Sequence, residues 1–242
     1  MAATGAMRGL FVAGTDTGVG KSVLSAALLA AIVAAGERAR AFKPAVTGLE
    51  ELSEEPGAGA WPPDHELLAS VTGVTGAEVS PYLLAAAASP RFAAALAGER
   101  IELDVMLARA RELAADGTLI VEGVGGLLVP LTERHSVRDL AAALGLGLLV
   151  AARPGLGTIN HTLLTLEAAR AASLDVRAVV LTPWPLEPTA LERSNRDTIA
   201  ELGGVEVHTL GWLAGADARA LADAGGRLPW RAWLAARGGG HA

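Results

Sequence analysis

Residues 9–26 read GLFVAGTDTGVGKSVLSA, and this stretch decides the fold class. The short apolar run at 9–14 predicts a buried strand, and the Ala- and Leu-rich segment at 24–36 predicts a helix. A glycine-rich loop that ends in Gly20-Lys21-Ser22 joins the two. The N–H groups of such a loop and of the following helix N-terminus converge on an anion. The stretch therefore predicts a phosphate-binding loop.

The loop departs from the usual phosphate-binding pattern by one residue. That pattern is Gly, four residues, then Gly-Lys-Ser/Thr, whereas here the first glycine lies one position further back, at Gly14. The extra residue changes the path of the loop and leaves its N–H donors in place. Lys21 is expected to reach the β- and γ-phosphates of a nucleotide, and the Ser22 hydroxyl is expected to ligate Mg²⁺. The alternative is a glycine loop used for packing, with Lys21 in solvent.

Short apolar runs alternate with helical segments along the rest of the chain. This alternation predicts an α/β fold, a three-layer α/β/α domain with a mostly parallel sheet whose ligands bind at the carboxyl ends of the strands. We expect a single domain over residues 1–242, disordered ends at 1–6 and 238–242, and an acidic surface loop at 49–63. The further expected strands are 38–42, 118–123, 146–152, 176–182 and 205–211, and the further expected helices are 64–73, 103–115, 158–172 and 188–202.

Composition excludes several classes of protein. With 51% hydrophobic and 19% charged residues, the chain buries a large core and is not disordered. The formal charge of −6 and the lack of a Lys/Arg run argue against a nucleic-acid partner. Cysteine is absent, which excludes disulfides, Cys-ligated zinc and thiol nucleophiles. The first six residues carry no basic region ahead of an apolar one, and no apolar run reaches ~20 residues. We therefore expect no signal peptide, no membrane partner and a cytoplasmic location.

The chain contains only two lysines, and the second is Lys43 in FKPAVTG, residues 42–48. It follows a predicted strand, where a lysine faces the ligand crevice. A fixed cation in that place stabilises the charge on a transferring phosphoryl group. Thr47 and Gly48 offer a hydroxyl and an accessible N–H nearby. The alternative is a surface lysine in a turn.

Two carboxylates are candidate magnesium ligands. Glu122 ends an apolar strand in VEGVGG, residues 121–126, where enzymes with this loop keep an acidic residue that holds Mg²⁺ directly or through water. The glycines after it allow a ligand to approach the backbone. As an alternative, Glu122 caps a turn. Asp64 opens a predicted helix, and the sequence leaves open whether it is an N-cap or a second Mg²⁺ ligand.

Taken together, these stretches resemble the dethiobiotin synthetase family, ATP-dependent enzymes that close the ureido ring in biotin synthesis. The extra residue of the phosphate loop belongs to the family's form of the motif. The resemblance extends over roughly residues 8–213, and the matching pieces, in the family's order, are GTDTGVGKS, KPAVTG, the Asp of PPDHELL, VEGVGG and LGTINH.

The resemblance implies a reaction and a set of site residues. The substrates would be 7,8-diaminononanoate, CO₂ or bicarbonate, and ATP or another nucleoside triphosphate with Mg²⁺, and the protein would be a homodimer. The implied catalytic residues are Lys43, Lys21 and Thr17, and the implied metal ligands are Ser22, Asp64 and Glu122. Implied nucleotide contacts are Gly18, Val19, Gly20, Lys21, Ser22, Val23, Asp64, Glu122, Gly123, Val124, Gly125, Thr182, Pro183, Gly211, Ala214, Gly215 and Ala216. Implied substrate contacts are Thr47 and, reaching the substrate carboxylate of the neighbouring subunit, Gly157, Thr158, Ile159 and Asn160.

The chain departs from the family where the nucleotide base is expected. Many members end the preceding strand with Asn-Asp, and the Asn reads adenine, whereas this chain has Thr182-Pro183. Proline has no N–H, and threonine cannot present the paired donor and acceptor of an amide. We therefore predict weak discrimination among nucleoside triphosphates.

Two other functions fit parts of the pattern. A cobyrinic-acid amidating enzyme carries a similar loop but uses a cysteine-dependent glutaminase domain, and this chain has no cysteine. A nucleotide-switch ATPase of the partition or septum-site type usually carries an additional lysine early in the loop, where this chain has Gly14-Thr15-Asp16. Hydrolysis stimulated by DNA or lipid, and not by a diamine, would favour the second alternative.

Overall fold

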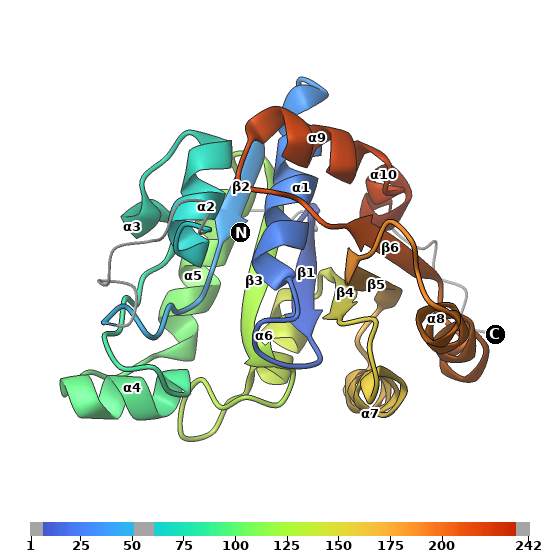
Figure 1. The fold of residues 1–242 in the computed structure, drawn as a ribbon. Coiled ribbons are helices and arrows are strands. Elements are labelled where there is room, and N and C mark those ends of the chain that lie inside the picture. The colour runs from blue at the N-terminus through green and yellow to red at the C-terminus, as the bar shows by residue number, and fades with distance from the viewer. Residues whose placement is uncertain (1–6, 51–60, 236–242) are drawn as a thin grey trace.

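A parallel sheet forms the centre of the molecule (Figure 1). The computed structural model describes residues 7–50 and 61–235, and within them six strands pair in the order β2-β3-β1-β4-β5-β6. All five pairings are parallel, which confirms the predicted fold class. The strands are β1 (Gly9–Gly14), β2 (Ala39–Phe42), β3 (Thr118–Gly126), β4 (Gly147–Ala152), β5 (Val176–Trp184) and β6 (Val207–Gly211).

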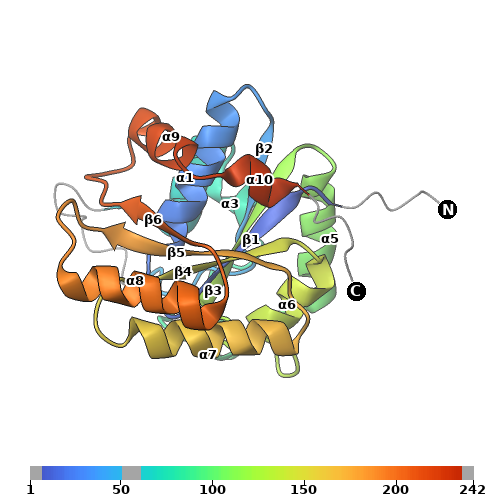
Figure 2. The same ribbon diagram turned by 90° about the vertical axis from the view of Figure 1, so that its right-hand side faces the viewer.

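Helices cover both faces of the sheet. In Figure 2, α1 and α9 lie above the sheet and α7 and α8 lie below it. The core under the first face also includes α2 and α10, and the core under the second also includes α4, α5 and α6. The helices of the described residues are α1 (Lys21–Ala34), α2 (Asp64–Thr72), α3 (Gly76–Val79), α4 (Pro90–Ala97), α5 (Leu103–Ala114), α6 (Val137–Leu144), α7 (Thr158–Ala171), α8 (Ala190–Gly203), α9 (Ala218–Gly226) and α10 (Trp230–Leu234).

The strand residues divide between the two cores because side chains alternate along a strand. In β1, Leu10 and Val12 pack under α1, whereas Phe11 and Ala13 pack on the opposite side. All six residues of β1 are buried. A strand covered on both faces has no solvated side, which is why it reads as an uninterrupted apolar run.

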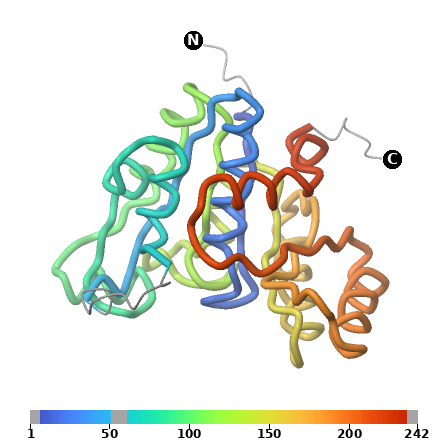
Figure 3. Tube along the Cα trace, turned by 45° about the horizontal axis from the view of Figure 1, so that its top comes forward, coloured from blue at the N-terminus to red at the C-terminus, as the bar shows by residue number. Residues whose placement is uncertain are grey.

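Close packing of α9 on α1 depends on a glycine. Figure 3 shows the red α9 segment crossing the blue α1. A Cβ atom on Gly225 would lie 2.0 Å from the carbonyl oxygen of Ala27, so any larger residue forces the two helices apart. The neighbouring Gly226 has no atom within 4 Å of the equivalent position.

The predicted elements are present, with shifted ends. Helix α1 begins at Lys21, directly after the glycine-rich loop and three residues before the Ala- and Leu-rich segment, with Gly20 in the left-handed conformation as its N-cap. Strands β3 and β5 continue to Gly126 and Trp184, beyond the predicted ends at 123 and 182. Helices α3, α4, α6, α9 and α10 were not predicted; they span four to nine residues, too short for a clear helical period. Most of the expected surface loop, residues 51–60, and the expected disordered ends lie outside the described residues.

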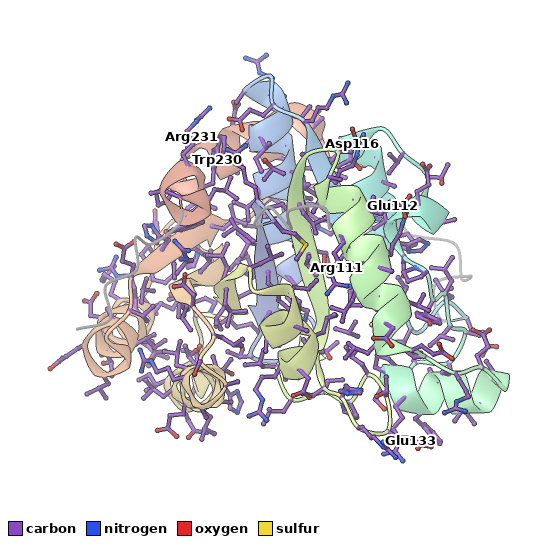
Figure 4. All side chains as sticks on the ribbon, turned by 180° about the vertical axis from the view of Figure 1, so that it is seen from behind. Arg111, Glu112, Asp116, Glu133, Trp230 and Arg231 are labelled. Carbon is purple, nitrogen blue, oxygen red and sulfur yellow. The ribbon has the colours of Figure 1, made fainter. Side chains whose placement is uncertain are left out.

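The outer surface carries charges of both signs. In Figure 4, Arg111 and Glu112 lie on the outer side of α5, and Arg231 lies beside Trp230 of α10. The Arg231 guanidinium is 4.0 Å from the centre of the Trp230 ring. No helix among the described residues has the length and apolar character required to span a membrane.

Candidate active site

Strand order brings the candidate residues to one place. Strand β3 lies between β2 and β1, and all three are parallel, so their carboxyl ends meet at one edge of the sheet. Lys43 directly follows β2, Glu122 lies on β3, and the phosphate loop follows β1. In Figure 1 this loop lies at the lower edge of the sheet. The convergence predicted from the sequence is therefore present.

The phosphate loop is held in a compact form by its glycines. Gly20 has φ of 91°, and a Cβ atom there would lie 2.7 Å from the Thr182 methyl carbon. A side chain at this position is excluded both by backbone conformation and by space. Lys21 is 7% exposed, and its Nζ donates a hydrogen bond to the Asp16 carbonyl oxygen at 2.9 Å. The packing alternative, which places Lys21 in solvent, is wrong.

Lys43 joins the two predicted carboxylates. Its Nζ lies 2.6 Å from Asp64 Oδ2 and 2.5 Å from Glu122 Oε1. The Ser22 hydroxyl bridges the same pair, at 2.7 Å from Asp64 Oδ1 and 2.9 Å from Glu122 Oε1. Lys43 is 3% exposed and Glu122 is fully buried. Lys43 is thus not a surface lysine, and Glu122 does not cap a turn.

The charges of this cluster depend on one another. Burial raises the pKa of Glu122 although the Lys43 ammonium opposes the rise. Burial also disfavours the charged form of Lys43, but Glu122 and Asp64 outweigh it and keep the pKa of Lys43 above its ordinary value. Burial raises the pKa of Asp64 as well, yet Lys43 and the Ser22 hydrogen bond leave it below its usual value. Lys43 is therefore a permanent cation at neutral pH.

Lys21 behaves differently from Lys43. Burial lowers the pKa of Lys21 to about 8, an effect that Glu122 opposes and the neighbouring Lys43 charge increases. Its hydrogen-bond acceptor is a neutral carbonyl, whereas Lys43 contacts two carboxylates. An anion placed beside Lys21 would stabilise its charged form. The loop therefore favours a negatively charged ligand.

The donor set fits a magnesium ion. Mg²⁺ prefers oxygen ligands and is usually bound by one or two carboxylates together with substrate phosphates and water. Glu122 Oε2 is buried without a hydrogen-bond partner, beside the Ser22 hydroxyl and Asp64. Pro63 occupies the N-cap position of α2 and Asp64 is its first residue, so the N-cap alternative for Asp64 is wrong. Among the described residues, no three His, Cys, Asp or Glu side chains form a group suited to a metal ion, so the Ser22 hydroxyl, phosphate or water would complete the ligand set.

A cavity of about 760 Å³ opens beside this cluster. The residues named from the sequence that line the cavity are Thr17, Gly18, Gly20, Lys21, Ser22, Val23, Lys43, Thr47, Gly48, Asp64, Val124 and Gly125. Glu122 contacts this wall through Lys43 and Ser22. The sequence thus identified about half of the residues that line the cavity, the two lysines among them.

Other named residues lie outside the cavity lining. Val19 and Gly123 are buried, and Thr182, also buried, packs against Gly20. Pro183 is exposed. Gly211 ends β6, and Ala214, Gly215 and Ala216 follow it. Gly157 is the N-cap of α7, and Thr158, Ile159 and Asn160 form its first turn.

The sequence reasoning missed several mostly apolar residues of the cavity lining. They are Trp61, Pro62 and Pro63 before α2, Leu67 within it, Val46 and Val129, and the segment Ala87, Ala88, Ser89 and Pro90 at the start of α4. Serine followed by proline is a helix-start signal that could have located α4. These residues are mostly apolar, so the cavity combines two lysines with a lining suited to a hydrocarbon chain.

Comparison with known proteins agrees with this site. A family model described as an AAA domain matches residues 8–213. The chain is 46% identical over 208 residues to the ATP-dependent dethiobiotin synthetase BioD of Anaeromyxobacter sp. (strain K), covering 81% of this chain and 90% of the relative. Its identity to the protein of the same name from Mycobacterium avium (strain 104) is 42% over 199 residues, covering 81% and 84%. Its identity to the BioD protein of Haloferax mediterranei is 39% over 202 residues, covering 82% of each chain.

Solved structures support the fold. The structure of McdA from Cyanothece matches with a TM-score of 0.50 at 16% identity, covering 90% of each chain. The signal recognition particle receptor FtsY from Elizabethkingia anophelis matches with a TM-score of 0.50 at 13% identity, covering 91% of this chain and 66% of that one. At these identities the likeness concerns the fold alone. From the sequence identities and their coverage, the chain belongs to the dethiobiotin synthetase family.

Proposed function

We propose that this protein forms dethiobiotin from 7,8-diaminononanoate, CO₂ and ATP, a ring-closing step of biotin biosynthesis. The observation that supports the site most directly is the contact of Lys43 with Asp64 and Glu122 beside the phosphate loop and the cavity. Family membership supports the reaction, and the positions of the residues around the cavity support the roles proposed for them below.

The phosphate loop binds the triphosphate. Its N–H groups and the N-terminus of α1 face the anion, and Lys21 adds a positive charge. When bound, Mg²⁺ would neutralise charge on the transferring phosphoryl group, and Ser22, Asp64 and Glu122 are the residues that would hold it. These contacts fix the nucleotide with its terminal phosphate towards the cavity.

The cavity holds the diamine and its carbamate. One neutral amine attacks CO₂, forms a C–N bond and loses a proton, which gives a carbamate. A carbamate oxygen then attacks the terminal phosphorus, and the bond from phosphorus to the ADP oxygen breaks. The product is a carbamic-phosphoric anhydride. Lys43, on the cavity wall, stabilises the charge that develops on the transferred phosphoryl group.

Ring closure uses the second amine. It attacks the carbamoyl carbon, the bond from this carbon to the phosphate oxygen breaks, and the nitrogen loses a proton. Phosphate leaves, and the cyclic urea remains. The apolar lining at Ala87 and Ala88 packs along the hydrocarbon chain and keeps the two amines adjacent. Thr17 and Thr47 provide hydroxyl groups in the same cavity.

The proposal includes a homodimer. The segment Gly157–Asn160 lies outside the cavity lining of its own chain, and Leu156 before it is 92% exposed. Leu164 of α7 is also exposed, at 55%. A neighbouring subunit would cover these apolar side chains, and the N–H groups at the start of α7 would bind the substrate carboxylate. A mixture of two variants tests the shared site. Lys43→Met and Asn160→Asp should each be inactive alone, and mixing them should restore part of the activity, because a mixed dimer has one site with both residues intact. Mixtures that stay inactive would contradict a shared site.

Phosphate release tests the reaction. The complete mixture contains 7,8-diaminononanoate, bicarbonate, Mg²⁺ and ATP, and each component is omitted in turn. We expect release only from the complete mixture, in a one-to-one ratio with dethiobiotin measured by mass spectrometry. Release that does not depend on the diamine, and is stimulated by DNA or lipid vesicles, would instead support the nucleotide-switch alternative.

A further inference from the structure

Arg153 connects a neighbouring strand to the phosphate loop. It directly follows β4, and β4 pairs with β1, whose carboxyl end carries the loop. Its Nε and Nη2 groups donate to the carbonyl oxygen of Gly18 at 3.3 and 3.1 Å. None of the motifs in the sequence pointed to this arginine.

The backbone that carries Arg153 is itself anchored. Asn195 of α8 is 4% exposed, and its Nδ2 donates to the carbonyl oxygens of Pro154 and Gly155 at 2.9 and 3.1 Å. Pro154 is buried. The segment after Arg153 is therefore fixed to α8, and the backbone from which the guanidinium extends to the loop is held in place.

The Gly18 carbonyl and the Val19 N–H belong to one peptide group. Because that group is planar and trans, the two point in opposite directions. Gly18 lines the cavity, whereas Arg153 is not part of its lining. When Arg153 holds the carbonyl, the N–H is turned to the other side. Within residues 7–50 and 61–235, no protein acceptor takes the Val19 N–H.

We propose that Arg153 is a positioning residue that fixes the Gly18–Val19 peptide with its N–H directed at the nucleotide phosphates. Gly18 has φ of 68°, and a glycine at such a position also has access to other conformations. A reversed peptide would turn its carbonyl towards the anion and repel it. The two donors of the guanidinium stabilise the productive orientation before the nucleotide arrives. This inference rests on the nucleotide site of the proposed function.

Nucleotide affinity tests the inference without the diamine substrate. The variants are Arg153→Gln and Arg153→Lys, and the matched control is Arg170→Gln, because Arg170 donates to the Gly203 carbonyl far from the loop. Binding of MgADP is measured by calorimetry, and folding is followed by the melting temperature. We expect Arg153→Gln to bind MgADP about ten- to a hundredfold more weakly, with a melting temperature within a few degrees of the parent. The MgADP affinity of Arg153→Lys should lie between those of Arg153→Gln and the parent, because the ammonium keeps the charge but donates from one nitrogen instead of two.

The outcomes separate positioning from other roles. MgADP affinity of Arg153→Gln within twofold of the parent would overturn the proposal, as would an equal loss of affinity in Arg170→Gln. Should Arg153→Gln fail to fold, Arg153→Lys decides, and unchanged affinity in that variant would also overturn it. A failure of the proposed ring closure would appear as absent dethiobiotin with nucleotide binding intact, so the two failures are distinguishable.

Discussion

Replacing Lys43 with methionine tests the electrostatics of the site most severely. The substitution keeps much of the side-chain volume and removes the ammonium that contacts Glu122 and Asp64. Glu122 is fully buried, so it loses its closest counter-charge without gaining water. We expect the variant to lose phosphoryl transfer and also a large part of its stability.

The size of the stability loss follows from the contacts. Removing one partner of a buried ion pair costs about 3–5 kcal/mol, because the other charge remains buried and uncompensated. For a chain of this length each kcal/mol lowers the melting temperature by about 2–4 °C, so we expect a fall of roughly 6–20 °C. The Asp64 side chain is 46% exposed and contributes less of this loss than Glu122.

The loss depends on pH in a defined direction. Burial raises the pKa of Glu122 above its ordinary value, 4.5, and Lys43 is the largest influence that opposes the rise. In Lys43→Met only the weaker effect of Lys21 still opposes it. A folded state that binds a proton more tightly than the unfolded state is stabilised at low pH and loses that stability as pH rises through the folded pKa. Lys43→Met should therefore be closest to the parent near pH 5 and furthest from it near pH 8.

Thermal unfolding at several pH values, with Lys43→Met, Glu122→Gln and the double variant, measures this effect. The double variant should regain most of the stability lost in Lys43→Met, because glutamine keeps the shape of Glu122 without its charge. Added Mg²⁺ should raise the melting temperature of Lys43→Met more than that of the parent, since the ion replaces the missing cation. A Lys43→Met protein that melts within about 2 °C of the parent at every pH, or a double variant that regains nothing, would refute the reasoning.

Three further predictions concern separate parts of the molecule. Glu122→Gln should raise the Mg²⁺ concentration for half-maximal rate about tenfold or more, and an unchanged Mg²⁺ titration would remove Glu122 from the metal site. The kcat/KM values for ATP, CTP and GTP should lie within about tenfold of one another, because neither Thr182 nor Pro183 has the side-chain amide with which an asparagine reads adenine. A preference for ATP above about a hundredfold would contradict this. Gly225→Val should lower stability by about 1–3 kcal/mol through its clash with the Ala27 carbonyl, measured by thermal unfolding, whereas Gly226→Ala, which meets no atom within 4 Å, should have little effect.

The sequence predicts the cationic side of the site because that side obeys a general rule. Residues at the carboxyl ends of adjacent parallel strands meet at one edge of the sheet, and Lys43 and Glu122 both follow from this rule. The roles of the two residues followed from their chemistry, since a lysine next to a phosphate loop binds phosphate and a carboxylate there binds Mg²⁺. The residues alone left Asp64 open, because the start of a helix suits both a cap and a ligand, and only the family resemblance assigned it to the metal.

The apolar residues of the cavity lining and Arg153 could not be predicted in the same way. Ala87 and Ser89 lie in a stretch of small residues with no period, and only the folded chain brings that stretch to the cavity. The contact of Arg153 with Gly18 depends on β4 pairing with β1, and the alternation of strands and helices does not reveal which strands are neighbours. The longer course of β5 to Trp184 likewise depends on its pairing with Gly211 of β6.

A crystal structure with Mg²⁺, a non-hydrolysable ATP analogue and 7,8-diaminononanoate tests the central claim most directly. The account predicts one magnesium ion on Ser22, Asp64 and Glu122, with the Nζ atoms of Lys21 and Lys43 both within about 3 Å of oxygens of the terminal phosphate. The diamine should lie along Ala87 and Ala88 in the same cavity. A terminal phosphate bound away from Lys43, or a diamine outside this cavity, would contradict the account.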